Sequence, residues 1–358
     1  MIRSAGASGP APSRKVAGAH PAHAAPGPYV GHRSRTTRVF ALALAVPCVG
    51  LIAVSIGSVE LAPSVVWSAL VHPASATMAH AIVWDLRVPR VLLAMVVGAG
   101  LGMAGAMLQA MFRNPLVDPY ITGVSAGAAL AAAIGFTFGA AFAAIPALAF
   151  AGGLLCAALV AWIGAGDGAA GNLRLVLAGV AVSAFASALV TLILLQREQT
   201  SGLDILSWLA GGIGGRGWRD LSMMLPYLGA GCIFAFAQVN ALNLLRLGST
   251  AAAGFGLPVL AARWRVIGAA ALITAACVSV SGIVGFVGLM VPHVLRRFIS
   301  GDARWLLAGS AFGGAIVVTI ADLIARTALA PVEIPLGVLL AFVGVPFFLI
   351  VARRPVEL

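Results

Sequence analysis

The sequence carries unusually little charge. Only 9% of its 358 residues are Asp, Glu, Lys or Arg, while 61% are hydrophobic. Soluble domains carry about 25% charged residues, so this chain cannot supply the polar surface of a water-soluble domain of its size. Its apolar runs are continuous and about twenty residues long, which is the length of a membrane-crossing helix and not the alternating pattern of a β-barrel. The composition predicts an all-α polytopic membrane protein.

The chain also lacks a nucleotide-binding loop. No segment of the printed sequence has the form GxxxxGK[ST], so we expect that it is not an enzyme and that any ATP is hydrolysed by a partner. Carboxylates are scarce as well, and Asp322 and Glu333 flank the outer ends of the last two apolar segments. Because ion-driven carriers keep such groups at mid-membrane, an ion-coupled secondary transporter is only a remote alternative.

Cysteine and lysine are scarce too. The four cysteines form no CxxC pair, so we expect neither a metal site nor a cofactor. The net charge of +11 comes almost entirely from arginine. Because no basic and aromatic residues interleave, nucleic acid is not an expected partner; in a membrane protein such charge favours cytoplasmic loops and anionic headgroups.

We divide the chain into a disordered cytoplasmic tail (1–38), a transmembrane domain (39–354) and a C-terminal tail (355–358). Counting Lys and Arg with both termini inside puts 16 of the 22 on the cytoplasmic side, which supports an N-in/C-in topology. The apolar runs predict ten transmembrane helices, at 39–58, 88–111, 119–140, 144–164, 173–195, 221–239, 265–284, 286–299, 304–325 and 335–352.

Three arginines are expected on the outer face. Arg87 and Arg90 flank Val88-Pro89 at the start of the second segment, and Arg326 ends the ninth. They either anchor their helices by snorkelling to the interface or form a cationic pad for an acidic partner. The residues alone leave both interpretations open.

The longest cytoplasmic loop, at about 240–264, is not polar. Ser249 or Thr250 could cap a short helix that ends at Gly254 or Gly256. A short, partly apolar helix outside the membrane needs either a soluble partner or the bilayer surface to pack against.

Two glycine-containing motifs complete the inventory. The run from Gly282 to His293 combines glycines with Pro292 and predicts a break between two helices. Gly123-Val124-Ser125-Ala126-Gly127 matches the GxSxG pattern of serine hydrolases, but this pattern arises easily by chance in helices rich in Gly, Ala and Ser.

Several of these motifs, Phe112-Arg113-Asn114-Pro115-Leu116 among them, together resemble the permease subunits of ABC importers for iron–siderophores, haem and cobalamin. The resemblance covers nearly all of 39–354, and its strongest blocks are 86–90, 109–127, 242–257, 282–297 and 321–348. It implies the ten-helix type II ABC importer permease fold, with a second copy or homologue, two ATP-binding subunits and a periplasmic substrate-binding protein as partners.

The resemblance also implies roles for single residues. Arginines matching Arg87, Arg90 and Arg326 meet glutamates of the binding protein. The coupling helices in the cytoplasmic loop fit a groove on the ATPase. The positions matching that coupling loop are Gly248, Ala252, Phe255, Gly256 and Leu257.

This sequence departs from the family pattern at two places in the loop. Ser249-Thr250 replaces the usual acidic pair, and Ala253 stands at a commonly basic position. We therefore expect the docking site without the salt bridges that those acidic residues would make.

The implied function is import of an iron(III)-siderophore or haem-type chelate from periplasm to cytoplasm, across the bacterial inner membrane. Gly211-Gly212-Ile213 stands where many siderophore permeases have Gly-Ser-Leu, and it resembles cobalamin permeases somewhat more. Cobalamin is therefore the alternative cargo.

Overall fold

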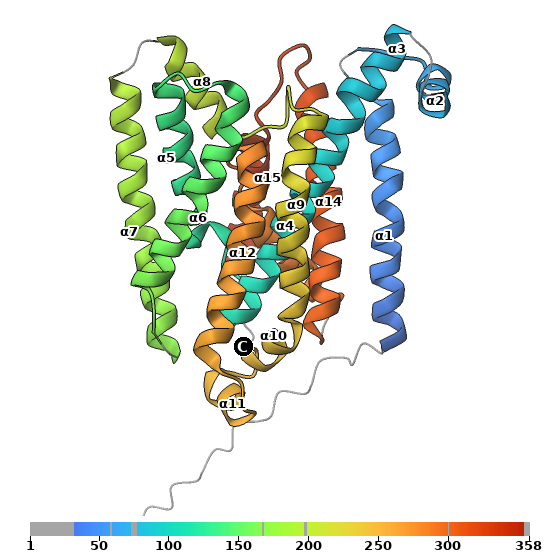
Figure 1. Cartoon of the computed structure of the whole chain (residues 1–358). Helices are drawn as coiled ribbons and strands as arrows, with labels where there is room; N and C mark the ends of the chain where they lie inside the picture. The colour runs from blue at the N-terminus through green and yellow to red at the C-terminus, as the bar shows by residue number, and fades with distance from the viewer. Residues whose placement is uncertain are drawn as a thin grey trace, which may run out of the picture.

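The computed structural model describes residues 32–57, 59–72, 77–166, 168–196, 199–299 and 301–353. Residues 1–31 and 355–358 of the expected tails lie outside this part, whereas residues 32–38, expected to belong to the disordered tail, are helical. The described residues form helices and no strands, and the long helices run roughly along one axis (Figure 1).

Seven helical segments are long and apolar enough to cross a membrane: α1 (His32–Ser55), α3 to α4 (Met78–Phe112), α6 (Ile145–Ile163), α7 (Gly168–Leu195), α9 (Trp218–Ala237), α12 (Val259–Ser281) and α14 (Ala303–Thr327). Three shorter apolar helices accompany them: α5 (Val124–Thr137), α13 (Val287–Arg296) and α15 (Leu336–Ala352). Each of the ten predicted apolar segments therefore coincides with a helix.

The main differences are at the ends of these helices. α1 begins at His32, although its apolar run was expected from residue 39, and α12 begins at Val259 rather than at 265. Both extensions contain arginines, which favour helix and extend helices beyond the apolar stretch. Hydropathy marks where a helix is apolar, not where its backbone hydrogen bonding starts.

Smaller helices gather at the two ends of the bundle. α2 (Pro63–Val71), α3 (Met78–Ala81) and α8 (Gln199–Leu209) lie at the upper end in Figure 1, here called the α8 end. A π-helical turn, η1 (Ile82–Arg87), joins α3 to α4 (Val88–Phe112). α10 (Val239–Leu245) and α11 (Ser249–Gly254) lie at the opposite end, here called the α11 end.

The core is built around α4, which packs against α12, α13 and α14. Gly98 and Gly102 lie directly against the backbone of α14: a Cβ added at Gly98 would stand 2.2 Å from the carbonyl oxygen of Gly314. The same holds for Gly102 and the carbonyl oxygen of Ser310, also at 2.2 Å. Small residues thus let the two backbones touch, as expected for the GxxxG pattern.

The predicted break within Gly282–His293 is confirmed at its glycines, whereas Pro292 lies inside α13 and does not interrupt it. α12 ends at Ser281, Gly282 adopts φ +64°, and α13 begins at Val287. Tyr120 lies in the short 3-10 helix η2 (Pro119–Thr122) before α5. Its hydroxyl donates to the carbonyl oxygen of Val284 (2.5 Å) and accepts from the N–H of Val284 (2.9 Å). These bonds satisfy backbone groups that the interrupted helix leaves unpaired.

Candidate functional site

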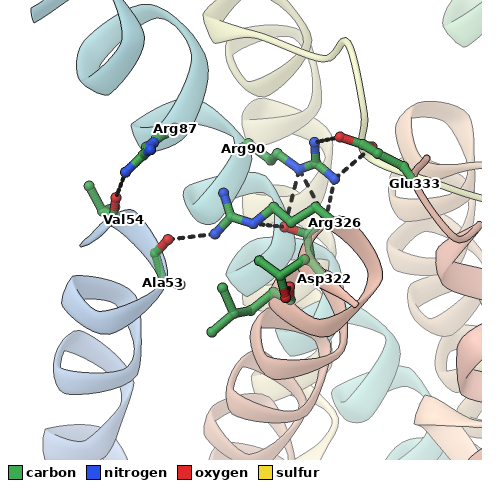
Figure 2. Close-up of polar contacts among 9 residues, drawn as sticks. Ala53, Val54, Arg87, Arg90, Asp322, Arg326 and Glu333 are labelled. Carbon is green, nitrogen blue, oxygen red and sulfur yellow. Dashed lines mark hydrogen bonds and ion pairs between the residues drawn. The ribbon is translucent and has the colours of Figure 1, made fainter. Parts of the chain in front are cut away.

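Arg90 is the centre of a charged cluster at the α8 end. Its Nε and Nη2 donate to Asp322 Oδ1 at 3.1 and 3.0 Å, and its Nη1 donates to Glu333 Oε1 at 2.7 Å (Figure 2). Asp322 comes from α14 and is 2% exposed, whereas Glu333 comes from the loop after α14 and is 44% exposed. One guanidinium therefore joins a buried carboxylate to an accessible one, in the charge-assisted geometry for which arginine is suited.

Arg87 and Arg326 bind the end of α1. Arg87 Nη1 donates to the carbonyl oxygens of Val54 (2.9 Å) and Ser55 (3.1 Å), and Arg326 Nη2 donates to that of Ala53 (2.5 Å). These are last-turn carbonyls, which have no partner within the helix and carry the negative end of the helix dipole. Two cations, one from the end of η1 and one from α14, thus cap the C-terminal end of α1 (Figure 2).

The residues alone left open either interfacial anchors or a cationic pad, whereas the structure shows buried arginines that bond within the protein. The three residues do meet at one end, but Arg87 and Arg326 are each 4% exposed and Arg90 is 14% exposed. Arg326 Nε also lies 3.6 Å from Asp322 Oδ2. Neither snorkelling nor a free pad describes this arrangement, and the docking role stays a prediction.

Two hollows flank the Arg90–Glu333 pair. One, of about 260 Å³, extends to Trp208, Gly211 and Leu336; the other, of about 310 Å³, extends to Gly57 and Arg326. Both are lined by Arg90 and Glu333. The hydrogen bond from Arg90 holds the pKa of the Glu333 carboxyl below its ordinary value, against the opposing effect of partial burial.

Arg216, one of the six arginines that the topology count puts on the outer side, was not predicted as a site residue. It also lines both hollows, and it is 9% exposed. Its guanidinium lies 4.8 Å from the ring centroid of Phe142 and 3.5 Å from Asp220 Oδ1. Burial lowers the pKa of Arg216, and the charge of Asp220 opposes that effect. Arg216 and Asp220 have opposite charges and are four residues apart around the start of α9, a sequence pattern that indicates a local ion pair.

The expected coupling residues gather at the tip of the α11 end. The short helix forms and ends at Gly254, as predicted, but its N-cap is Gly248, and neither Ser249 nor Thr250 caps it with a side-chain hydrogen bond. Gly248 has φ +107°, a conformation that residues with a side chain disfavour. Glycine therefore starts this helix where a hydroxyl cap was expected.

The coupling positions differ in exposure. Phe255 is 71% exposed and Gly256 is also exposed, with φ +81°. Leu257 is half-buried, and Ala252 is fully buried, at 0% exposure. The tip thus presents one large aromatic side chain to its surroundings, while Ala252 belongs to the packing of the tip itself.

Hydrogen bonds fix α10 to the turn between α13 and α14. Asn243 donates to Asp302 Oδ1 at 2.9 Å and accepts from the N–H of Ala303 at 2.8 Å, and Arg246 donates to the carbonyl oxygen of Gly301. Burial would raise the pKa of Asp302, but the hydrogen bonds from Asn243 and the N–H of Arg304 lower it below its ordinary value. α10, which precedes the α11 tip, is therefore held against the turn before α14.

Gln109 links α4 to α13. Its amide nitrogen donates to the carbonyl oxygens of Gly288 (3.2 Å) and Leu289 (3.1 Å), and its oxygen accepts from Arg296 at 3.0 Å. The side chain is fully buried in α4. It supplies donors to carbonyls at the start of α13, so α4 and the interrupted helix are held as one unit.

Known proteins resemble the chain over most of its length. It is 36% identical over 311 residues to the hemin transport system permease protein HmuU of Yersinia pestis, covering 85% of this chain and 91% of that protein. It is also 36% identical over 311 residues to the iron(3+)-hydroxamate import system permease protein FhuB of Bacillus subtilis, covering 86% and 80%. The cobalamin import system permease protein BtuC of Halobacterium salinarum is 36% identical over 279 residues, covering 77% and 74%.

A solved structure described as an inward-facing conformation of a putative metal-chelate type ABC transporter superposes with a TM-score of 0.79. It is 29% identical and covers 89% of this chain and 100% of its own. The model of the FecCD transport family matches residues 43–354, which include every long helix after the start of α1. The chain is therefore a multi-pass membrane protein that belongs to the FecCD transport family.

Proposed function

We propose that this chain is the membrane-spanning subunit of an ABC importer that moves an iron(III)-siderophore or haem-type chelate from periplasm to cytoplasm. The observation that carries the proposal is membership of the FecCD transport family over 43–354. Relatives named for hemin and iron(3+)-hydroxamate transport support the class of cargo. The absence of a GxxxxGK[ST] loop from the sequence fits an energy source in a separate ATP-binding subunit.

All ten apolar helices cross the bacterial inner membrane in this proposal, with both termini inside. Three of them, α5, α13 and α15, are shorter than a bilayer core, and each packs against longer helices. A short helix at membrane depth is tolerated when its neighbours shield it. The arginine distribution puts the α11 end in the cytoplasm and the α8 end in the periplasm.

Two ATP-binding subunits dock at the α11 end, one on each of two permease copies or homologues. The exposed ring of Phe255 supports this, because a large apolar side chain on a projecting tip gains most when a partner covers it. The backbone of the tip around Phe255 is formed by the other coupling positions, Gly248, Ala252, Gly256 and Leu257. Rigid rocking of the paired permeases then opens the path alternately to each side.

A periplasmic substrate-binding protein docks at the α8 end. Arg90 is the arginine positioned to meet an acidic partner, because its neighbour Glu333 is partly exposed and a second carboxylate can take its place. Arg87 and Arg326 act in docking only by holding the end of α1 in position. Cobalamin remains the alternative cargo, since a relative named for cobalamin import is as similar as those named for iron chelates.

The test is reconstitution with the ATP-binding subunit in liposomes. Phe255→Asp is expected to release the ATP-binding subunit from the complex and to abolish ATP-driven uptake. Leu329→Asp, at a comparably exposed apolar residue of the opposite end (61% exposed), is the matched control and is expected to retain the ATP-binding subunit. Uptake without nucleotide would overturn the proposal and favour an ion-coupled secondary transporter; equal co-purification of both variants would overturn the assigned coupling tip.

A further inference from the structure

An apolar groove of about 460 Å³ lies between α1 and α13 near the α11 end. Both helices pack against α14, and the groove runs between them. Its lining includes Ala41 and Leu42 of α1, Val294 of α13 and Phe298, which follows α13. Arg38 is the charged residue among those that line it. We call this the α1–α13 groove.

The rim of the groove is cationic. Arg38 is exposed and donates one hydrogen bond, from Nη1 to the carbonyl oxygen of Phe298 at 2.8 Å. Because a guanidinium has five N–H donors, it can bind a further acceptor. Arg35, one turn earlier, lies against Gly301, and Arg297 is exposed beside Phe298. The groove therefore combines an apolar slot with several guanidinium groups at one end.

Little negative charge balances this rim. In the part of the chain that the structure describes, no carboxylate forms an ion pair with Arg35 or Arg38. Asp302 is the carboxylate of the neighbouring turn, and it already accepts from Asn243 and from the N–H of Arg304. An anion with an apolar body is the ligand that this combination of surfaces fits.

We propose that the α1–α13 groove binds one anionic phospholipid, with an acyl chain along Ala41 and Val294 and the phosphate at Arg38. The groove lies along the apolar span of α1, so lipid chains reach it directly. Basic pockets between membrane helices on the cytoplasmic side bind anionic headgroups, and a positively charged rim would not favour a second apolar helix. The inference rests on the proposed topology, in which the α11 end faces the cytoplasm, and is independent of the cargo.

Native mass spectrometry of the delipidated full-length protein in detergent tests this, with phosphatidylglycerol and phosphatidylcholine of identical acyl chains as probes. The first phosphatidylglycerol is expected to bind at lower lipid concentration than the first phosphatidylcholine. Arg38→Gln should weaken phosphatidylglycerol binding roughly fivefold and leave phosphatidylcholine unchanged. Arg38→Lys, which keeps the charge, should preserve the preference.

Two further variants define the site. Ala41→Trp fills the slot and should remove the first molecule of both lipids. Arg265→Gln removes an exposed arginine of α12 at the same end and should change neither lipid's binding.

Equal binding of the two lipids, or equal effects of the Arg38→Gln and Arg265→Gln variants, would overturn the proposal. So would an Ala41→Trp variant that keeps its lipid but changes the number of chains per complex, because the groove would then hold a second copy. If Ala41→Trp fails to fold by circular dichroism, the Arg38 variants alone decide.

Discussion

Arg90 of α4 and Glu333 of the α14–α15 connection, 243 residues apart in sequence, form a 2.7 Å ion pair that lines both hollows of the α8 end. The buried carboxylate of Asp322 fixes the other side of the same guanidinium. Any acidic partner that uses Arg90 therefore competes with Glu333, the more exposed of the two internal carboxylates. Docking of an acidic partner at Arg90 therefore requires the Arg90–Glu333 ion pair to open.

Glu333→Gln is predicted to strengthen binding of the substrate-binding protein to the reconstituted complex. Because the pair is partly exposed, the competition is worth up to about 1 kcal/mol, or about fivefold in affinity. Surface plasmon resonance of the complex in nanodiscs measures the change. Glu60→Gln, which removes an exposed carboxylate at the same end, is the control. Weaker binding of the Glu333→Gln variant would mean that Glu333 itself contacts the partner.

The Arg90–Glu333 pair also gives a pH dependence with a definite sign. The pKa of Glu333 in the folded protein lies below its ordinary value of 4.5, so the pair contributes its full stability above that value. The contribution is lost as the pH falls through the lowered pKa. The melting temperature of the wild type should therefore exceed that of Glu333→Gln by a constant amount from pH 8 to 6, and the difference should shrink below pH 4.5 and vanish once the pH is below the lowered pKa. A difference that grows on acidification would contradict the lowered pKa.

Arg87→Gln is predicted to destabilise the protein rather than to act on docking alone. It leaves the terminal carbonyls of Val54 and Ser55 without their partner, which costs about 1–3 kcal/mol for buried groups. Thermal unfolding in detergent measures this loss. Arg219→Gln, at an exposed arginine of the same end, should melt like the wild type. If both variants melt alike, the bonds to α1 do not contribute to stability.

Gly98→Ala and Gly229→Ala are predicted to change stability in opposite directions. A Cβ at position 98 meets the backbone of α14, and such overpacking costs about 1–3 kcal/mol. At Gly229, on the exposed side of α9, a Cβ meets nothing within 4 Å, so alanine should stabilise the helix by about 0.5–1 kcal/mol. The melting temperatures of the two variants, measured in one detergent, check the contrast. A neutral Gly98→Ala variant would show that α4 and α14 can move apart.

The helices were predictable because the cost of placing polar groups in lipid forces long apolar runs, which hydropathy reads directly. The break at Gly282 followed from the glycines of the run that begins there, whereas the Gly98 contact could not be singled out among the 43 glycines of the sequence. The role of Arg87 was not predictable, because its acceptors are backbone carbonyls of Val54 and Ser55, and a carbonyl leaves no mark on residue identity. The cap of α11 was wrongly assigned to a hydroxyl residue: the N-cap is Gly248, with φ +107°, and no side chain caps the helix.

The attachment of α1 limits how the molecule can be shortened. This outermost helix is bonded at one end by Arg87 and Arg326 and at the other by Arg38. Deleting it would remove the carbonyl acceptors of Ala53, Val54 and Ser55 from two buried guanidinium groups, those of Arg87 and Arg326. A buried hydrogen-bonding group left without its partner costs about 1–3 kcal/mol. A trimmed version that starts at α2 is thus not a smaller scaffold for engineering, since the rest of the bundle depends on the helix that was removed.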